Sequence, residues 1–123
     1  MMFAQYVGAS WEARGCWQLL RRVYAEQLGL ELPSYAEEYG DGSGAAALIL
    51  AESVAWHAVP PGGERPGDAA LFSMAGDPAH VGVVVGAGRF LHIREGQTAT
   101  IESYRGPIWS RRLVGFFRHA EAP

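Results

Sequence analysis

The sequence predicts an α+β domain in which amino-terminal helices pack on an antiparallel sheet of about five strands. Helical periodicity is confined to the first half of the chain. The second half is rich in Val, Phe and Ile, in short stretches separated by Gly and Pro. No internal repeat, low-complexity tract or linker interrupts the 123 residues. We therefore expect residues 1–123 to form a single domain, long enough to bury a core without disulfides or a structural metal.

An amphipathic helix is expected over residues 16–28. Gly29 suits the position after the helix, where a left-handed backbone is common, and Pro33 prevents the helix from resuming. A second helix is expected within residues 44–58, ended by the Pro60-Pro61 pair. The apolar stripe of the first helix has the spacing of one helix face and consists of Cys16, Leu19, Leu20, Val23, Tyr24 and Leu28.

Strands are expected after the loop PPGGERPGD, where the apolar residues alternate with a period of two. Their order after the helices is typical of an antiparallel sheet. The predicted strands lie near residues 68–74, 80–86, 89–95, 98–103 and 112–118.

Composition excludes several classes of function. The net charge is −3 and no segment is strongly basic, so nucleic-acid binding is not expected. One cysteine cannot form an internal disulfide or a cysteine-rich metal centre. No apolar run approaches the ~18 residues of a membrane helix, and the start MMFAQYVGAS lacks the regions of a signal peptide. We expect a protein made in the cytoplasm without a leader and without membrane partners.

Cys16 is the candidate nucleophile, because it lies where the first predicted helix begins. The amino end of a helix carries partial positive charge, which favours the thiolate form of a cysteine. The backbone N–H groups there can also stabilise an oxyanion on an attacked carbonyl. The alternative is that Cys16 is a small buried hydrophobe on the core stripe.

His80 and His92 are the candidate partners, because both lie in the segment HVGVVVGAGRFLHIREG. This segment predicts a hairpin that turns at residues 86–88. A three-residue loop makes Val84 face Phe90, so that His80 and His92 become diagonal neighbours on one face of the sheet. A two-residue loop shifts the parity and puts the two histidines on opposite faces.

Together these three residues can perform thiol chemistry. His80 would remove the thiol proton, or hold Cys16 as a thiolate–imidazolium pair, and then protonate the leaving amine. His92 would bond the far nitrogen of His80 and fix its tautomer. Alternatively, the three residues could be ligands of a catalytic zinc. Because no usual ligand pair or obvious acid/base lies nearby, we expect no metal and no cofactor.

With these residues in place, the chain resembles the NlpC-type family of papain-like bacterial cell-wall cysteine peptidases. GCWQLLRRVY is similar to the family's nucleophile motif Asp-Cys-(Ser/Trp)-Gly-Leu-Val, and RPGDAALF to its strand signal Pro-Gly-Asp-Leu-x-x-Phe. HVGVVVGAGRFLHI is similar to His-Val-Gly-Ile-x-x-Gly-x-Gly-x-x-x-His. The resemblance implies a papain-like fold with Cys16 as the nucleophile, His80 as the general base and His92 as the orienting residue.

The resemblance places four positions near the nucleophile, where substrate or oxyanion contacts are expected. YVGASW is similar to the family's Gly-x-Pro-Tyr segment, with Trp11 where tyrosine is usual. An indole N–H can donate in place of the phenol but cannot accept. Gly15 replaces an aspartate, Gln18 replaces a glycine, and Trp17 is the neighbour expected beside the site. We expect substrate or oxyanion roles for Trp11, Gly15 and Trp17.

The resemblance also implies a substrate and a setting. The tryptophan after the cysteine, EQLGLELPSY and LVGFFRH are similar to NlpC-like proteins encoded with phage tails and gene transfer agents. The implied function is hydrolysis of a peptidoglycan stem-peptide amide, between D-glutamate and a diamino acid. The implied delivery is as part of a phage-tail-like particle, with tail structural proteins as partners. The alternatives are a structural tail-tip or wall-binding module, and an amidase or acyltransferase on the same fold.

Overall fold

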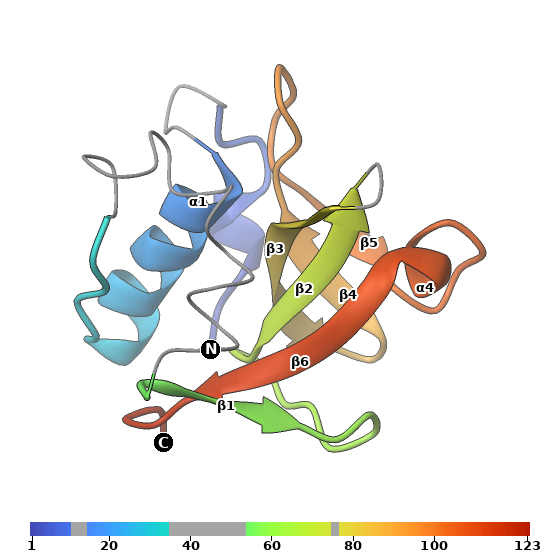
Figure 1. Ribbon diagram of the computed structural model, residues 1–123. Coiled ribbons are helices and arrows are strands. Elements are labelled where there is room, and N and C mark those ends of the chain that lie inside the picture. The colour runs from blue at the N-terminus through green and yellow to red at the C-terminus, as the bar shows by residue number, and fades with distance from the viewer. Residues whose placement is uncertain (11–14, 35–53, 75–76) are drawn as a thin grey trace.

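The computed structural model describes residues 1–10, 15–34, 54–74 and 77–123 (Figure 1). Its centre is a six-stranded antiparallel sheet in the order β1-β6-β2-β3-β4-β5. The α+β prediction is confirmed, with one strand more than expected. The strands are β1 (Trp56–Val59), β2 (Ala69–Met74), β3 (Asp77–Gly86), β4 (Arg89–His92), β5 (Thr100–Ser103) and β6 (Leu113–His119).

The first predicted helix is present over its whole expected length. It consists of α1 (Cys16–Val23) and a wider, π-type turn, η3 (Tyr24–Leu28). Gly29 ends it with φ of 66°, the left-handed conformation expected from the sequence. A short 3₁₀ turn, η1 (Ala4–Tyr6), precedes α1, and the four-residue helix α4 (Trp109–Arg112) precedes β6.

The second predicted helix, over residues 44–58, is wrong at its carboxyl end. Residues 56–59 form β1, which pairs with β6 at the edge of the sheet. Trp56 and Val59 are both buried, in the clusters on opposite faces of the sheet, so the strand lacks the simple alternation that identifies strands in sequence. Residues 44–53 lie outside the described part of the chain.

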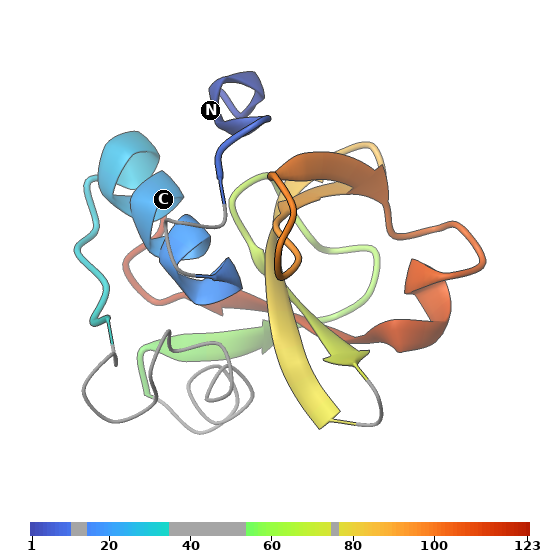
Figure 2. The same ribbon diagram turned by 90° about the horizontal axis from the view of Figure 1, so that it is seen from above.

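The sheet is covered on both faces. Val81, Val83, Leu91 and Ile93 share one apolar cluster with the buried face of α1, and α1 packs against β3. The other face carries a second cluster, which includes Trp109 of α4. Figure 2 shows α1 and α4 on opposite sides of the sheet. Among the described helices, none has the length and apolar character needed to cross a membrane.

A buried ion pair joins the start of β2 to β6. Asp68 is 3% exposed, and its carboxylate accepts two hydrogen bonds from the Arg118 guanidinium, at 2.8 and 2.7 Å. The same carboxylate accepts the backbone N–H of Arg65 at 2.8 Å. The pair therefore fixes the turn that leads into the central strands.

Candidate active site

The β3–β4 hairpin decides whether the two candidate histidines meet. Its turn has two residues, Ala87 and Gly88, with φ of 55° and 75°, rather than the three expected. Positive φ at both positions is typical of the tight turns that suit a twisted hairpin. Two turn residues alone would reverse the parity of the strands. A bulge corrects it, because pairing passes from Val84 opposite Phe90 directly to Gly86 opposite Arg89.

His80 and His92 consequently lie on the same face and contact each other. His80 Nε2 is 2.9 Å from His92 Nδ1, and the two rings are nearly perpendicular. Both are buried, with exposed fractions of 7% for His80 and 0% for His92. The structure therefore brings together the two histidines that the sequence paired, through a turn of a different length.

Gly82 makes room for this contact. A Cβ atom at Gly82 would lie 2.7 Å from Phe90 Cδ2, 2.9 Å from the Leu91 carbonyl oxygen and 3.2 Å from His92 Cβ. Two of these three neighbours belong to residues on the histidine face of β4, and the third is backbone. Any side chain at Gly82 must therefore displace the strand that carries His92.

We expect Gly82→Ala to lower the free energy of unfolding by about 1–3 kcal/mol, because the added methyl overpacks the hairpin. Urea denaturation monitored by tryptophan fluorescence measures the change. Gly106→Ala is the matched control, since a Cβ at Gly106 would meet no atom within 4 Å. Equal losses in the two variants would contradict this explanation of Gly82.

Aromatic rings enclose the histidine pair. Trp109 stacks on His80 with centroids 5.5 Å apart, and its edge meets His92 at 4.9 Å. Phe90 stacks on His92 with centroids 4.3 Å apart and also contacts Trp109. Phe72 also contacts the cluster, with its ring centroid 6.2 Å from that of His80. The rings hold both imidazoles in fixed orientations and exclude water from them.

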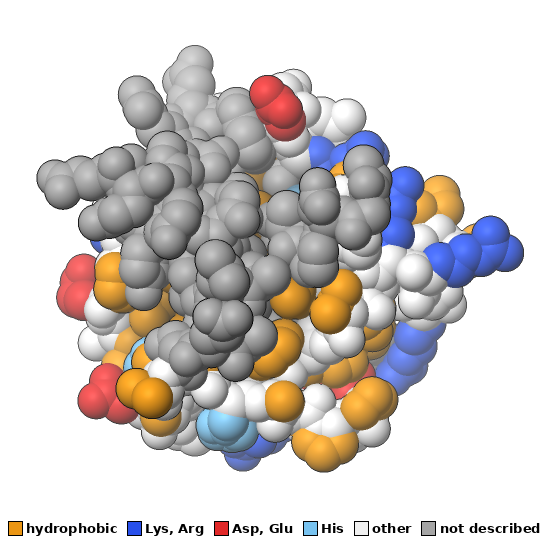
Figure 3. Space-filling model, in the orientation of Figure 1, with side chains coloured by type: hydrophobic (Ala, Val, Ile, Leu, Met, Phe, Trp, Pro, Cys, Tyr) orange, Lys and Arg blue, Asp and Glu red, His pale blue; other side chains and the backbone are white. Residues whose placement is uncertain are grey.

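This enclosure keeps the histidines neutral. Burial, followed by the charges of His92, Arg94 and Arg112, lowers the pKa of His80 to about 3. Burial also lowers the pKa of His92, although Glu102 opposes that shift. Arginine side chains gather at the β5 and α4 side of the molecule (Figure 3). These surroundings therefore leave His80 neutral, with one ring nitrogen free to accept a proton, and disfavour a preformed imidazolium.

Glu102 is a site residue that the sequence analysis missed. Its Oε2 lies 2.5 Å from His92 Nε2, and its side chain is 42% exposed. In the sheet, β5 places Glu102 opposite Phe90 and thus diagonal to His92. The sequence predicts a strand over 98–103, but the connection from β4, which turns at Gly96, does not fix the register of β5 against β4. The sequence shows a polar residue at Glu102, but it does not show that His92 is its partner.

Cys16 is the first residue of α1 and is 3% exposed. Figures 1 and 2 show the amino end of α1 beside the sheet at β3, the strand that carries His80. Gly15 caps the helix with φ of 99° and ψ of 175°, a conformation that essentially only glycine adopts. Gly15 therefore has a backbone role, and an aspartate would be strained in this conformation.

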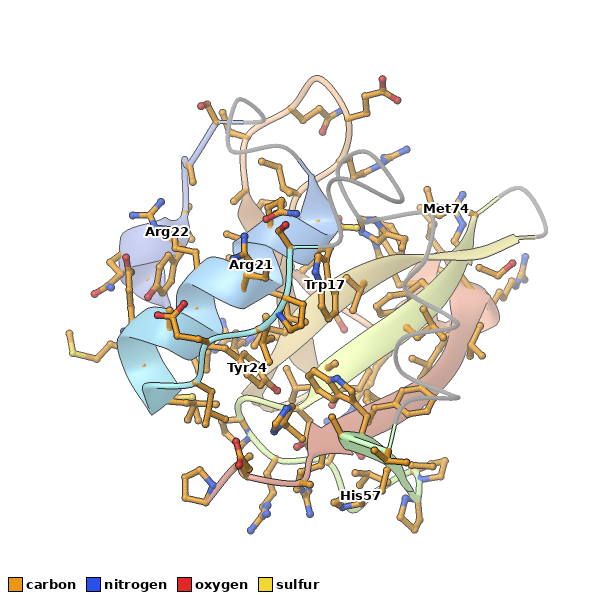
Figure 4. The ribbon with its side chains drawn as sticks, turned by 60° about the vertical axis from the view of Figure 1, so that its left-hand side comes forward. Trp17, Arg21, Arg22, Tyr24, His57 and Met74 are labelled. Carbon is orange, nitrogen blue, oxygen red and sulfur yellow. The ribbon has the colours of Figure 1, made fainter. Side chains whose placement is uncertain are left out.

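Of the two tryptophans predicted to contact substrate, the structure describes only Trp17. Trp17 is fully buried, and its Nε1 donates a hydrogen bond to the Pro33 carbonyl at 2.9 Å. Figure 4 shows this side chain within the molecule, between the helix and the strands. The Trp17 side chain therefore packs in the core, and the predicted substrate or oxyanion role of this residue stays a prediction. Trp11 lies outside the described residues.

Gln18, the other departure from the family motif, ties α1 to the segment that follows it. Its Nε2 donates to the Ser34 carbonyl at 3.0 Å, and its Oε1 accepts from Arg21 at 2.7 Å. Arg21 in turn donates to the Leu32 carbonyl at 2.8 Å. The Gln18 side chain, larger than the glycine of the family motif, therefore connects α1 to the segment that follows it.

The described residues contain no ligand set for the alternative of a catalytic zinc. No group of three or more His, Cys, Asp and Glu side chains is arranged there to hold a metal ion. The two imidazoles bond each other and Glu102 instead. We derive no step through a metal.

The sequence of the chain is similar to those of known proteins. The chain is similar to the Murein DD-endopeptidase MepS/Murein LD-carboxypeptidase of Escherichia coli (strain K12), with 28% identity over 106 residues, 85% of this chain and 49% of that protein. It is also similar to the Gamma-DL-glutamyl hydrolase of Bacillus subtilis (strain 168), with 29% identity over 109 residues, 87% of this chain and 23% of that protein. The chain thus spans about half the length of the first relative and about a quarter of the second.

The fold is similar to that of a solved NlpC/P60 family protein from Bacillus cereus. The TM-score is 0.63 at 20% identity, covering 85% of this chain and 31% of that one. The family model for NlpC/P60 matches residues 5–118, a range that contains Cys16, His80, His92 and Glu102. Sequence match and fold agree, and the chain belongs to the NlpC/P60 family.

Proposed function

We propose that this domain hydrolyses a stem-peptide amide of bacterial peptidoglycan with Cys16 as its nucleophile. The observation that carries the proposal is the buried contact of 2.9 Å between His92 of β4 and His80 of β3, the strand against which α1 packs. Family membership supports it, since two similar proteins are named as a murein endopeptidase and a glutamyl hydrolase.

The reaction follows from the properties of these groups. His80, neutral because it is buried, takes the thiol proton as the Cys16 sulfur attacks the amide carbonyl carbon. The amino end of α1 stabilises the negative charge that develops there. His80 then gives the proton to the leaving amine, and a thioester remains. Water attacks the thioester and His80 takes a proton from that water. The sulfur then leaves and takes this proton back from His80 as the product acid is released.

We place the cleaved bond between D-glutamate and a diamino acid. The motif resemblance supports this choice, as does the glutamyl bond named for the Bacillus subtilis relative. Arg94 and Arg112 add positive charge near His80, which suits a stem peptide rich in carboxylates. We further propose that the domain acts as part of a phage-tail-like particle, a setting supported by the motifs CWQLLRRVY and LVGFFRH.

Digestion of purified sacculi tests the proposal. Wild-type protein is expected to release soluble fragments that mass spectrometry identifies as stems cut after D-glutamate, and Cys16→Ala is expected to release none. Fragments that carry an added amine would identify an acyltransferase instead. Binding to sacculi with no release by the wild type would identify a structural wall-binding module and overturn the proposal.

A further inference from the structure

Glu102 lies at the solvent end of a chain of three side chains that reaches the proposed base. Glu102 Oε2 is 2.5 Å from His92 Nε2, and His92 Nδ1 is 2.9 Å from His80 Nε2. The two imidazoles are buried, whereas the Glu102 side chain is 42% exposed. The two contacts of His92 use different ring nitrogens. The nitrogen that carries its single proton is the hydrogen-bond donor, and the other nitrogen is the acceptor.

The carboxylate determines where that proton sits. An ionised carboxylate can only accept, so its contact with His92 requires a proton on Nε2. A neutral imidazole has one N–H, which leaves His92 Nδ1 as an acceptor for the Nε2–H of His80. The same rule leaves His80 Nδ1 without a proton. Burial lowers the pKa of both rings and keeps them in this neutral form.

We propose that Glu102 is a positioning residue that sets the direction of this chain and thereby makes His80 Nδ1 the atom that takes the Cys16 proton. The inference rests on the proposed function for the role of His80 as a base. His92 cannot set the direction alone, because either of its nitrogens can carry the proton. An acceptor-only group at one end removes this ambiguity, as in other histidine sites that a carboxylate orients.

The three hydrogen-bonded side chains also stabilise the charged form of His80 that arises during the reaction. When His80 takes the thiol proton at Nδ1, it becomes an imidazolium that still donates its Nε2–H to His92. Glu102 supplies a negative charge one imidazole away from the new cation. A carboxylate at that distance favours the imidazolium and opposes the depression of its pKa by burial.

Glu102→Gln tests the inference with little change of shape. The amide can donate as well as accept, so it allows the chain to run in either direction. ¹⁵N NMR of the imidazole nitrogens reads the tautomers directly. We expect both wild-type histidines to carry the proton on Nε2, and Glu102→Gln to populate the Nδ1–H form of each. We also expect kcat on a defined stem peptide to fall about 10-fold or more with KM nearly unchanged.

Glu121→Gln is the matched control, because it makes the same charge change at an exposed residue near the carboxyl terminus. It should alter neither tautomers nor kcat. Unchanged tautomers in Glu102→Gln would overturn the inference even if the wild type cleaves sacculi. A tautomer change in a protein that cleaves no stem peptide would instead retain the positioning role and remove the proposed function.

Discussion

Replacement of His80 by glutamine is expected to lower kcat/KM for stem-peptide hydrolysis by about 10³-fold, the contribution of a general base. Glutamine is similar in size and uncharged, so it can occupy the enclosure formed by Trp109 and Phe72 without accepting a proton from a thiol. Hydrolysis of a defined muropeptide, followed by chromatography, measures the loss. Circular dichroism shows whether the variant retains the fold.

His57→Gln is the matched control for this prediction. His57 is exposed on β1 (Figure 4), where it lies opposite Arg118 of β6, and β6 and β2 separate β1 from the strand that carries His80. Its substitution should leave kcat/KM within about twofold, the scatter expected of a surface change. If His80→Gln retained activity comparable to that of His57→Gln, His80 could not be the base.

Asp68→Ala is expected to lower the free energy of unfolding by roughly 3 kcal/mol, the largest effect on stability predicted for this chain. The substitution removes three hydrogen bonds and leaves the Arg118 guanidinium, only 18% exposed, without its counter-charge. We place the loss at the low end of the range for buried pairs, because Arg118 retains partial contact with water. Urea denaturation measures it.

An exposed pair, Arg22 of α1 and Glu26 of η3, provides the comparison. Arg22 and Glu26 lie 3.4 Å apart, with side chains 49% and 46% exposed, so Arg22→Ala should cost less than about 1 kcal/mol. Figure 4 shows Arg22 on the outer surface of the helix. A loss in Asp68→Ala no larger than that in Arg22→Ala would show that the buried pair does not hold β2 and β6 together.

The contact between the two histidines was predictable because the turn is shorter than expected and a bulge cancels the effect of that difference on strand parity. The segment GAG predicted a hairpin at the right place, but it could not reveal that only Ala87 and Gly88 form the turn. It also could not reveal the bulge that leaves Val85 outside the pairing and restores parity. Bulges depend on the twist of the whole sheet, so the local sequence carries little information about them.

The parts that escaped prediction depend on contacts between distant segments. Trp56 has a helical neighbourhood in the sequence, yet it forms a strand because the edge of β6 is available for pairing. Glu102 contacts His92 through the register of β5 against β4. In contrast, the helix that begins at Cys16 follows from its own periodicity and from Gly29.

Alkylation of the single thiol tests the central claim most directly, because Cys16 is the only cysteine among the 123 residues. Native protein is treated with iodoacetamide at neutral pH, and samples taken over time are assayed for hydrolysis of a defined stem peptide and for intact mass. We predict that activity falls in proportion to the fraction of protein that carries one added group on Cys16, and that the stem peptide slows both changes. A fully alkylated protein that hydrolyses the peptide at the untreated rate would contradict the account.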